Sequence, residues 1–120
     1  MTTSMFEKYG GVPSVKVVVN DFYAQMLSKP NLKRYFADTD MDRLAMHQIE
    51  FIAFALGKPK AFYKDQRLLD AHRHLQITDS SFNQTVEILK AVLEKAGFEP
   101  DDLQAVLRVV ETKRHLIVKR

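Results

Sequence analysis

The segment 41–57 has the sequence MDRLAMHQIEFIAFALG, in which apolar residues recur every three or four positions. This spacing predicts an amphipathic helix over residues 41–56, with Asp40 as its N-cap and Gly57 directly after its end. One polar residue, Gln48, interrupts the apolar face of that helix. Glutamine is rarely buried without hydrogen-bond partners, so a ligand that needs a donor would explain its position.

The same helical period runs through most of the chain. It predicts a short helix around Met5 to Tyr9, helices over residues 12–28 and 67–74, a long helix from Thr78 or Asp79 through Lys95, and a last helix from Pro100. Pro30 is expected to close the helix 12–28, and residues 58–66 are expected to form a loop because they have no clear period. No convincing strand is present, so we expect an all-α fold, one domain over residues 1–120 arranged as a small helical sandwich.

The composition excludes several classes of protein. Hydrophobic residues make up 46% of the chain and charged residues 28%, which is typical of a globular protein. The absence of cysteine excludes disulfides, thiolate nucleophiles, iron–sulfur clusters and cysteine zinc sites. No run of about 18 apolar residues occurs, and no signal peptide precedes the patterned sequence, so we expect a cytoplasmic protein without a membrane span.

The stretch LLDAHRHL at 68–75 contains His72 on an apolar helical face. In a chain without cysteine, such a histidine is the best candidate for a strong axial ligand to iron, although one histidine alone is weak evidence. Tyr23 shares the apolar stripe of the helix 12–28, where a core tyrosine whose hydroxyl reaches the surface is the commoner explanation. Together with Gln48, these residues suggest a haem pocket with a proximal and a distal side.

Two further histidines are less informative. His47 lies at the edge of the face that contains Gln48, where it is either a solvated residue or one that turns inward to ligate. His115 lies near the C-terminus and is most simply exposed. The sequence contains no His-Glu-x-x-His motif, no glycine-rich phosphate loop and no nucleophile elbow, so conventional hydrolase and kinase functions have no support.

The net charge of +3 comes from the C-terminal end of the chain. Its last eight residues contain no acid and four basic residues, Lys113, Arg114, Lys119 and Arg120. Such a group is most often a solvated helix end that complements the macrodipole. The alternative is a helical binding module that uses this end to contact nucleic acid or an acidic partner, but that hypothesis leaves Gln48 and His72 unexplained.

Several motifs in order resemble one known family, the group I truncated haemoglobins. They are MFEKYGG at 5–11, DFY at 21–23, FADTDM at 36–41, HQ at 47–48 with Phe51 and ALG at 55–57, and AH at 71–72 followed by Leu75, ITD at 77–79 and Phe82. Each motif is weak alone, but the ordered set is specific. The resemblance covers roughly residues 4–112.

This resemblance implies a truncated globin, a two-over-two helical sandwich around one b-type haem. His72 would be the proximal ligand, and the Tyr23 hydroxyl and the Gln48 amide would hydrogen-bond bound dioxygen. Leu44 would occupy the neighbouring distal position, where some members of the family have a second glutamine. The apolar faces of the haem would be lined by Phe36, Phe51, Leu68 and Phe82.

The resemblance also implies alternatives at the two remaining histidines. In some relatives a side chain at the position of His47 ligates the iron when no gas is bound. His47 would then make this chain a hexacoordinate bis-histidine protein for electron transfer or redox sensing. Other relatives have a histidine near the C-terminus that bonds covalently to the haem, and His115 lies near that position.

The leading hypothesis is therefore a haem protein that reversibly binds O₂, NO and CO. It would also oxidise nitric oxide to nitrate if a reductase supplied electrons. Bound O₂ has partial superoxide character, so donors aimed at its oxygens stabilise it. We expect a monomer that binds neither nucleic acid nor a membrane.

Overall fold

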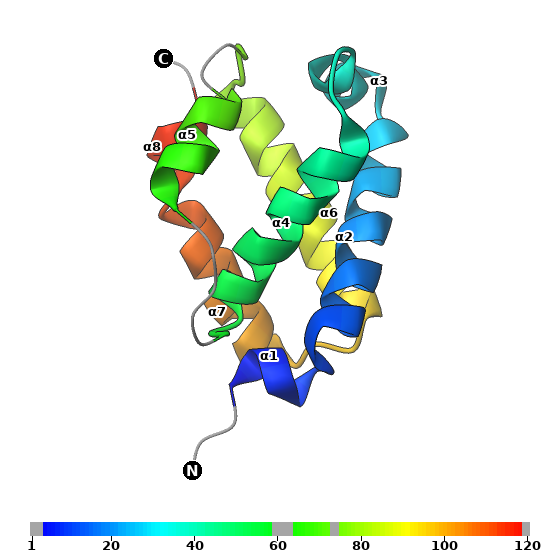
Figure 1. Cartoon of the computed structure of the whole chain (residues 1–120), viewed down its shortest axis with the longest axis vertical. Coiled ribbons are helices and arrows are strands. Elements are labelled where there is room, and N and C mark those ends of the chain that lie inside the picture. The colour runs from blue at the N-terminus through cyan, green and yellow to red at the C-terminus, as the bar shows by residue number, and fades with distance from the viewer. Residues whose placement is uncertain (1–3, 59–63, 73–74, 119–120) are drawn as a thin grey trace.

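The computed structural model describes residues 4–58, 64–72 and 75–118, and within these ranges it contains helices and no strand (Figure 1). In chain order the elements are α1 (Met5–Lys8), α2 (Gly11–Leu27), α3 (Pro30–Lys33), the 3-10 helix η1 (Arg34–Phe36), α4 (Met41–Ala55), α5 (Asp65–His72), α6 (Asp79–Lys95), α7 (Pro100–Glu111) and α8 (Arg114–Ile117). The predicted all-α class is confirmed. None of the described helices is long and apolar enough to cross a membrane.

Four helices form two layers. α2 packs against α4, α6 packs against α7, and the first pair crosses the second through contacts of α2 with α6 and of α4 with α7 (Figure 1). This arrangement confirms the two-over-two sandwich. α5 and α8 lie side by side at one end of the molecule, whereas α1 lies at the opposite end.

The predicted apolar stripes form the core between these layers. Val15 and Val19 of α2 are each 1% exposed, and Leu93 of α6 and Val106 of α7 have no exposed surface. Burying a side chain of this size contributes about 1.5–3 kcal/mol, so the stripes account for much of the driving force for helix packing. The helices form because their apolar faces are buried together, since isolated helices of this length are marginal in water.

Side chains and one glycine define several helix ends. Asp40 accepts a hydrogen bond from the Arg43 amide at 3.2 Å, and Thr78 accepts one from the Ser81 amide at 3.0 Å, as expected of N-caps. After α4 the chain turns at Gly57, whose φ of +82° lies in the left-handed region that favours glycine.

The helix predicted over residues 12–28 ends before Pro30, as expected: α2 ends at Leu27, and Lys29, the residue before the proline, is extended. Pro30 also opens α3, because proline at the first helical position lacks only an amide that has no partner there. One predicted helix boundary was wrong. α5 begins at Asp65, so the last two residues of the predicted loop 58–66 are helical. A hydrogen bond of 2.8 Å from Gln66 to Asp70 supports this first turn.

The C-terminal end also differs from expectation. The last predicted helix is interrupted between α7 and α8 at Thr112 and Lys113. Lys113 and Arg114 are not solvated charges, because their side chains are only 14% and 20% exposed and both form ion pairs. Lys119 and Arg120 lie outside the described residues, as does the end of the predicted helix 67–74.

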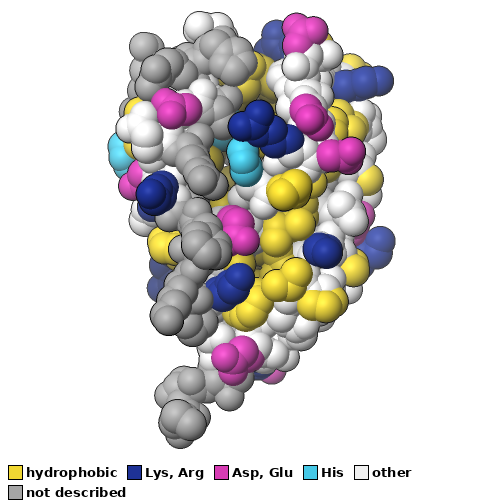
Figure 2. Space-filling model, in the orientation of Figure 1, with side chains coloured by type: hydrophobic (Ala, Val, Ile, Leu, Met, Phe, Trp, Pro, Cys, Tyr) yellow, Lys and Arg dark blue, Asp and Glu magenta, His cyan; other side chains and the backbone are white. Residues whose placement is uncertain are grey.

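On the face drawn in Figure 2, the basic side chains of the described residues do not gather into one region. On the face drawn in Figure 2, acidic and basic side chains of the described residues alternate around an apolar area. A protein that binds nucleic acid usually gathers its basic residues into a patch or stripe. This face therefore gives the alternative of a nucleic-acid-binding module no support.

We expect Leu93→Ala to lower the free energy of unfolding by about 2–5 kcal/mol, because it leaves a cavity where the two layers meet. Denaturation by urea would measure the loss. Val17→Ala is the matched control, since Val17 is 66% exposed and its truncation should change stability by no more than about 0.5 kcal/mol. Equal losses in the two variants would contradict this account of the core.

Candidate functional site

A mostly apolar cavity lies among α2, α4, α5, α6 and the C-terminal helices. Its empty space, including the part open to solvent, is about 920 Å³. Eight of the nine residues that the sequence analysis proposes for a haem site line it: Tyr23, Phe36, Leu44, Gln48, Phe51, Leu68, His72 and Phe82. These residues come from five elements, so folding brings together side chains that are as much as 59 positions apart in the chain.

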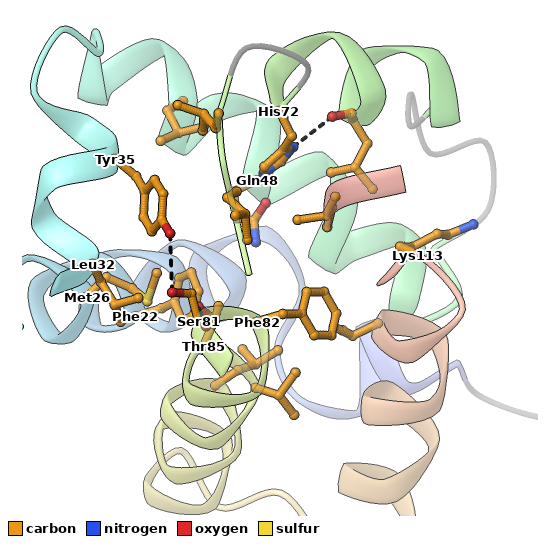
Figure 3. Close-up of a pocket in the computed structure, with 18 of the residues that line it drawn as sticks. Phe22, Met26, Leu32, Tyr35, Gln48, His72, Ser81, Phe82, Thr85 and Lys113 are labelled. Carbon is orange, nitrogen blue, oxygen red and sulfur yellow. Dashed lines mark hydrogen bonds between the residues drawn. The ribbon is translucent and has the colours of Figure 1, made fainter. Parts of the chain in front are cut away.

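His72 is the last residue of α5, and its ring points into the cavity (Figure 3). Its Nδ1 lies 2.7 Å from the carbonyl oxygen of Leu68, one helical turn earlier. A carbonyl can only accept, so Nδ1 is the donor and carries the proton. In the neutral ring the lone pair is then on Nε2, which is the arrangement of a metal-ligating imidazole whose other nitrogen donates to the backbone.

Tyr23 contributes a hydroxyl from α2. The side chain is buried and its ring contacts those of Phe22 and Phe36 edge to face, with centroids 5.1 Å and 5.9 Å away. Burial raises the pKa of the Tyr23 hydroxyl well above its ordinary value, so the group keeps its proton.

The Tyr23 hydroxyl forms no hydrogen bond with any residue in the described ranges. Within these ranges no fully buried side-chain oxygen or nitrogen lacks a partner, so this hydroxyl must open onto the cavity that Tyr23 lines. In a side chain as buried as that of Tyr23, a hydroxyl usually has a protein partner. The cavity therefore contains a donor that is available to a bound molecule.

Gln48 adds a second such group from α4. Its half-buried side chain points into the cavity (Figure 3), and its amide has no hydrogen-bond partner among the described residues. Leu44, one turn earlier on the same helix, is apolar and also lines the cavity. Tyr23 and Gln48 thus supply two polar side chains from helices that pack directly against each other.

His47 and His115 are both exposed, and neither lines the cavity. His47 is adjacent to Gln48 in the chain, but on a helix neighbouring residues project about 100° apart. The structure therefore separates His47 from the eight residues that share the cavity.

Sequence reasoning missed part of the cavity wall. The Tyr35 hydroxyl of η1 lies 3.3 Å from that of Ser81 (Figure 3). It also donates a hydrogen bond to the Gln76 carbonyl at 3.2 Å. Ser81 and Lys113 also line the cavity. Neither residue lies in a periodic pattern that points to a site, since one follows a helix cap and the other lies in a basic end expected to be solvated.

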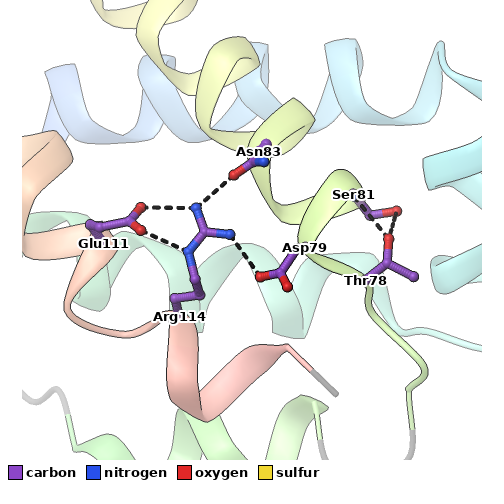
Figure 4. Close-up of polar contacts among 6 residues, drawn as sticks. All are labelled: Thr78, Asp79, Ser81, Asn83, Glu111 and Arg114. Carbon is purple, nitrogen blue, oxygen red and sulfur yellow. Dashed lines mark hydrogen bonds and ion pairs between the residues drawn. The ribbon is translucent and has the colours of Figure 1, made fainter. Parts of the chain in front are cut away.

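Arg114 supports the cavity wall from outside. Its guanidinium forms two hydrogen bonds with Glu111, at 2.7 Å and 3.1 Å, and others with Asp79 at 3.0 Å and Asn83 at 2.6 Å (Figure 4). It also lies 4.3 Å from the ring centroid of Phe82, which lines the cavity. This residue therefore joins α8 to both α6 and α7.

These features fit a large, mostly apolar ligand that contains a metal ion. The aromatic and aliphatic walls suit an apolar ring system, and His72 offers a nitrogen ligand. The hydroxyl of Tyr23 and the amide of Gln48 are suited to a small molecule bound at that metal. Among the described residues no cluster of histidine and acidic side chains could hold a metal ion by itself.

Comparison with known proteins agrees with this geometry. The profile of the bacterial-like globin family matches residues 4–119. A group 1 truncated hemoglobin of Tetrahymena thermophila is 31% identical over 111 residues, which cover 92% of this chain and 91% of the relative. The group 1 truncated hemoglobin GlbN of a Synechocystis species is 31% identical over 112 residues, with coverage of 90% and 89%.

Solved structures lead to the same family. The truncated hemoglobin of Tetrahymena pyriformis in its Fe(III) form superposes with a TM-score of 0.87 and 28% identity, covering 98% of this chain and 100% of that one. The 2/2 hemoglobin of a Synechococcus species, with covalently attached heme, gives a TM-score of 0.85, 27% identity and the same coverage. The chain therefore belongs to the group I truncated haemoglobins, within the bacterial-like globins, and this membership implies a haem cofactor and the binding of diatomic gases such as O₂.

Proposed function

We propose that this protein holds haem b in the cavity with His72 as its axial ligand and reversibly binds O₂, NO and CO on the opposite side. The observation that carries the proposal is the hydrogen bond between Nδ1 of His72 and the Leu68 carbonyl. It leaves the lone pair of the neutral ring on Nε2, inside an otherwise apolar cavity.

The chain's own residues have separable tasks in this proposal. Phe36, Phe51, Leu68 and Phe82 bury the apolar faces of the ring system and exclude water. The Leu68 carbonyl orients the imidazole of His72 and increases its basicity. When bound, the haem supplies an iron that takes up a diatomic gas.

Tyr23 and Gln48 determine how strongly a gas is retained. The hydroxyl of Tyr23 keeps its proton because burial raises its pKa, so it remains a donor at physiological pH. A donor aimed at a ligand with partial negative charge stabilises that ligand more in a dry cavity than in water. We expect O₂ to gain more from these donors than CO, which develops less negative charge.

We also propose a more specific, catalytic activity, the oxidation of nitric oxide to nitrate. Each turnover would combine one NO with one O₂ and one electron to give nitrate. The retention of O₂ by Tyr23 and Gln48 would favour it, and a separate reductase would have to supply the electron. We also propose that the protein acts as a cytoplasmic monomer.

His72→Gly should lower the affinity for haem by more than about 100-fold. Loss of a residue that only hydrogen-bonds to a metal ligand typically lowers metal affinity by roughly 10–100-fold. The reason is that His72→Gly removes the metal ligand itself. Titration of the purified protein with haem, followed by its Soret absorption, would measure the change. Added imidazole should restore the spectrum, because it can occupy the space left by the side chain.

His115→Ala is the control for this experiment, since His115 is exposed and does not line the cavity. It should bind haem as the wild type does. Unaltered haem affinity and spectrum in His72→Gly would refute the assignment of His72 as axial ligand.

Tyr23→Phe should accelerate O₂ dissociation by about 5- to 150-fold, the equivalent of a lost hydrogen bond of about 1–3 kcal/mol. Dissociation of CO should change little. Stopped-flow or flash photolysis would give both rates. In the wild type, the O₂ rate should stay constant as the pH rises to about 10, because the raised pKa of Tyr23 keeps the donor protonated beyond the ordinary phenol value.

Tyr35→Phe is the matched control. Tyr35 also lines the cavity, but its hydroxyl already donates to the Gln76 carbonyl, so its removal should leave the O₂ rate nearly unchanged. If Tyr23→Phe released O₂ no faster than Tyr35→Phe, the Tyr23 hydroxyl would have no role in gas retention.

His47→Ala should leave the absorption spectrum of the ferrous, gas-free protein unchanged. His47 is exposed and is separate from the cavity lining, so we do not include it among the iron ligands. Sharp low-spin bands that disappear in His47→Ala would instead establish the bis-histidine alternative.

A further inference from the structure

The helix that contains His72 lies at the edge of the fold. Among the described elements, α5 packs chiefly against α8, which is itself only four residues long (Figure 1). The contacts of α5 with the layered body of α2, α4, α6 and α7 are therefore mostly indirect and pass through α8. Any side chain that ties α5 to that body influences where the His72 ring lies in the cavity.

Lys113 is such a side chain. It lies in the turn between α7 and α8, and its Nζ is 3.0 Å from Oδ1 of Asp65, the first residue of α5. The same ammonium lies 5.6 Å from the ring centroid of Phe54 on α4. The Lys113 side chain is 14% exposed and lines the cavity, whereas that of Asp65 is 58% exposed, so solvent reaches the pair from the side of the carboxylate.

The register of α5 connects this contact with His72. Asp65, Leu68 and His72 are three and seven positions apart, which places them on one face of a helix with 3.6 residues per turn. The face that Lys113 holds through Asp65 is thus the face that contains the histidine and the carbonyl that orients it. Movement of this face away from the turn between α7 and α8 would separate Lys113 from Asp65.

We propose that Lys113 is a positioning residue, which through Asp65 sets the orientation of His72 in the cavity. The proposal rests on the proposed function, in which His72 is the axial ligand. Lys113 touches neither the gas nor the iron in this role. It acts by keeping α5 in one place against the body of the fold.

Three variants test the pair. Lys113→Met keeps most of the aliphatic chain but removes the charge, and Asp65→Asn removes the opposite charge from a side chain that is 58% exposed. Lys113→Arg keeps the charge and should behave as the wild type does. Lys8→Met is the matched control, because Lys8 pairs with Asp102 at 2.7 Å at the opposite end of the molecule.

Two readouts separate positioning from general stability. Amide hydrogen exchange of residues 65–72 in the full-length protein as purified should accelerate by about two- to ten-fold in Lys113→Met and Asp65→Asn. In the haem-loaded ferrous protein, the iron–histidine stretching band should broaden and shift to lower frequency in both variants. Lys113→Arg should keep the exchange rate of α5 and the iron–histidine band of the wild type, and Lys8→Met should alter neither.

The outcomes are decisive in each direction. Unchanged exchange in α5 and an unchanged iron–histidine band in Lys113→Met and Asp65→Asn would overturn the positioning role, as would equal effects in Lys8→Met. If Lys113→Met fails to fold, Asp65→Asn alone decides the question. Failure of the proposed function would show separately, as haem binding that does not depend on His72.

Discussion

The hydrogen bond from Nδ1 of His72 to the Leu68 carbonyl determines which nitrogen of the ring can act as a Lewis base. Both partners belong to α5, so the bond moves with the helix and is independent of how the rest of the protein packs. The eight-residue helix α5 alone is therefore sufficient to orient the imidazole and to place its lone pair on Nε2. The rest of the fold has the different task of bringing this helix to a cavity and keeping it there.

That task is performed by charged side chains at the turn between α7 and α8. Arg114 fixes α8 to α6 and α7 through hydrogen bonds with Asp79, Asn83 and Glu111, and its guanidinium lies over the ring of Phe82. Its neighbour Lys113 faces the other way, toward α5 and α4. Lys113 therefore connects the α7–α8 turn to α5 and α4, and Arg114 connects α8 to α6 and α7. Isolated exposed ion pairs contribute little to stability, so the role of these two residues is chiefly to position the helices.

Periodicity was sufficient to predict the longer helices, whereas most of the cavity lining was predicted only from the resemblance to the truncated haemoglobins. The stripes of α2, α4 and α6 are local patterns, and the caps Asp40 and Thr78 act within one turn, so the sequence contains what is needed to locate them. The ion pairs of Lys113 with Asp65 and of Arg114 with Asp79 cannot be predicted from the sequence, because the partners lie 48 and 35 positions apart. A local sequence pattern does not predict a contact between residues so far apart. It also does not predict that Gln48 lines the cavity while its neighbour His47 does not.

The two sides of the cavity differ in how they are held. Tyr23 and Gln48 project from α2 and α4, which pack against each other in the body of the fold, and Phe22 and Phe36 hold the Tyr23 ring edge to face. His72 projects from a helix at the periphery. Close packing resists small displacements, whereas a peripheral helix held by polar contacts can shift at low cost. Changes in sequence at the α7–α8 turn can therefore tune the imidazole side while the two donors stay in place.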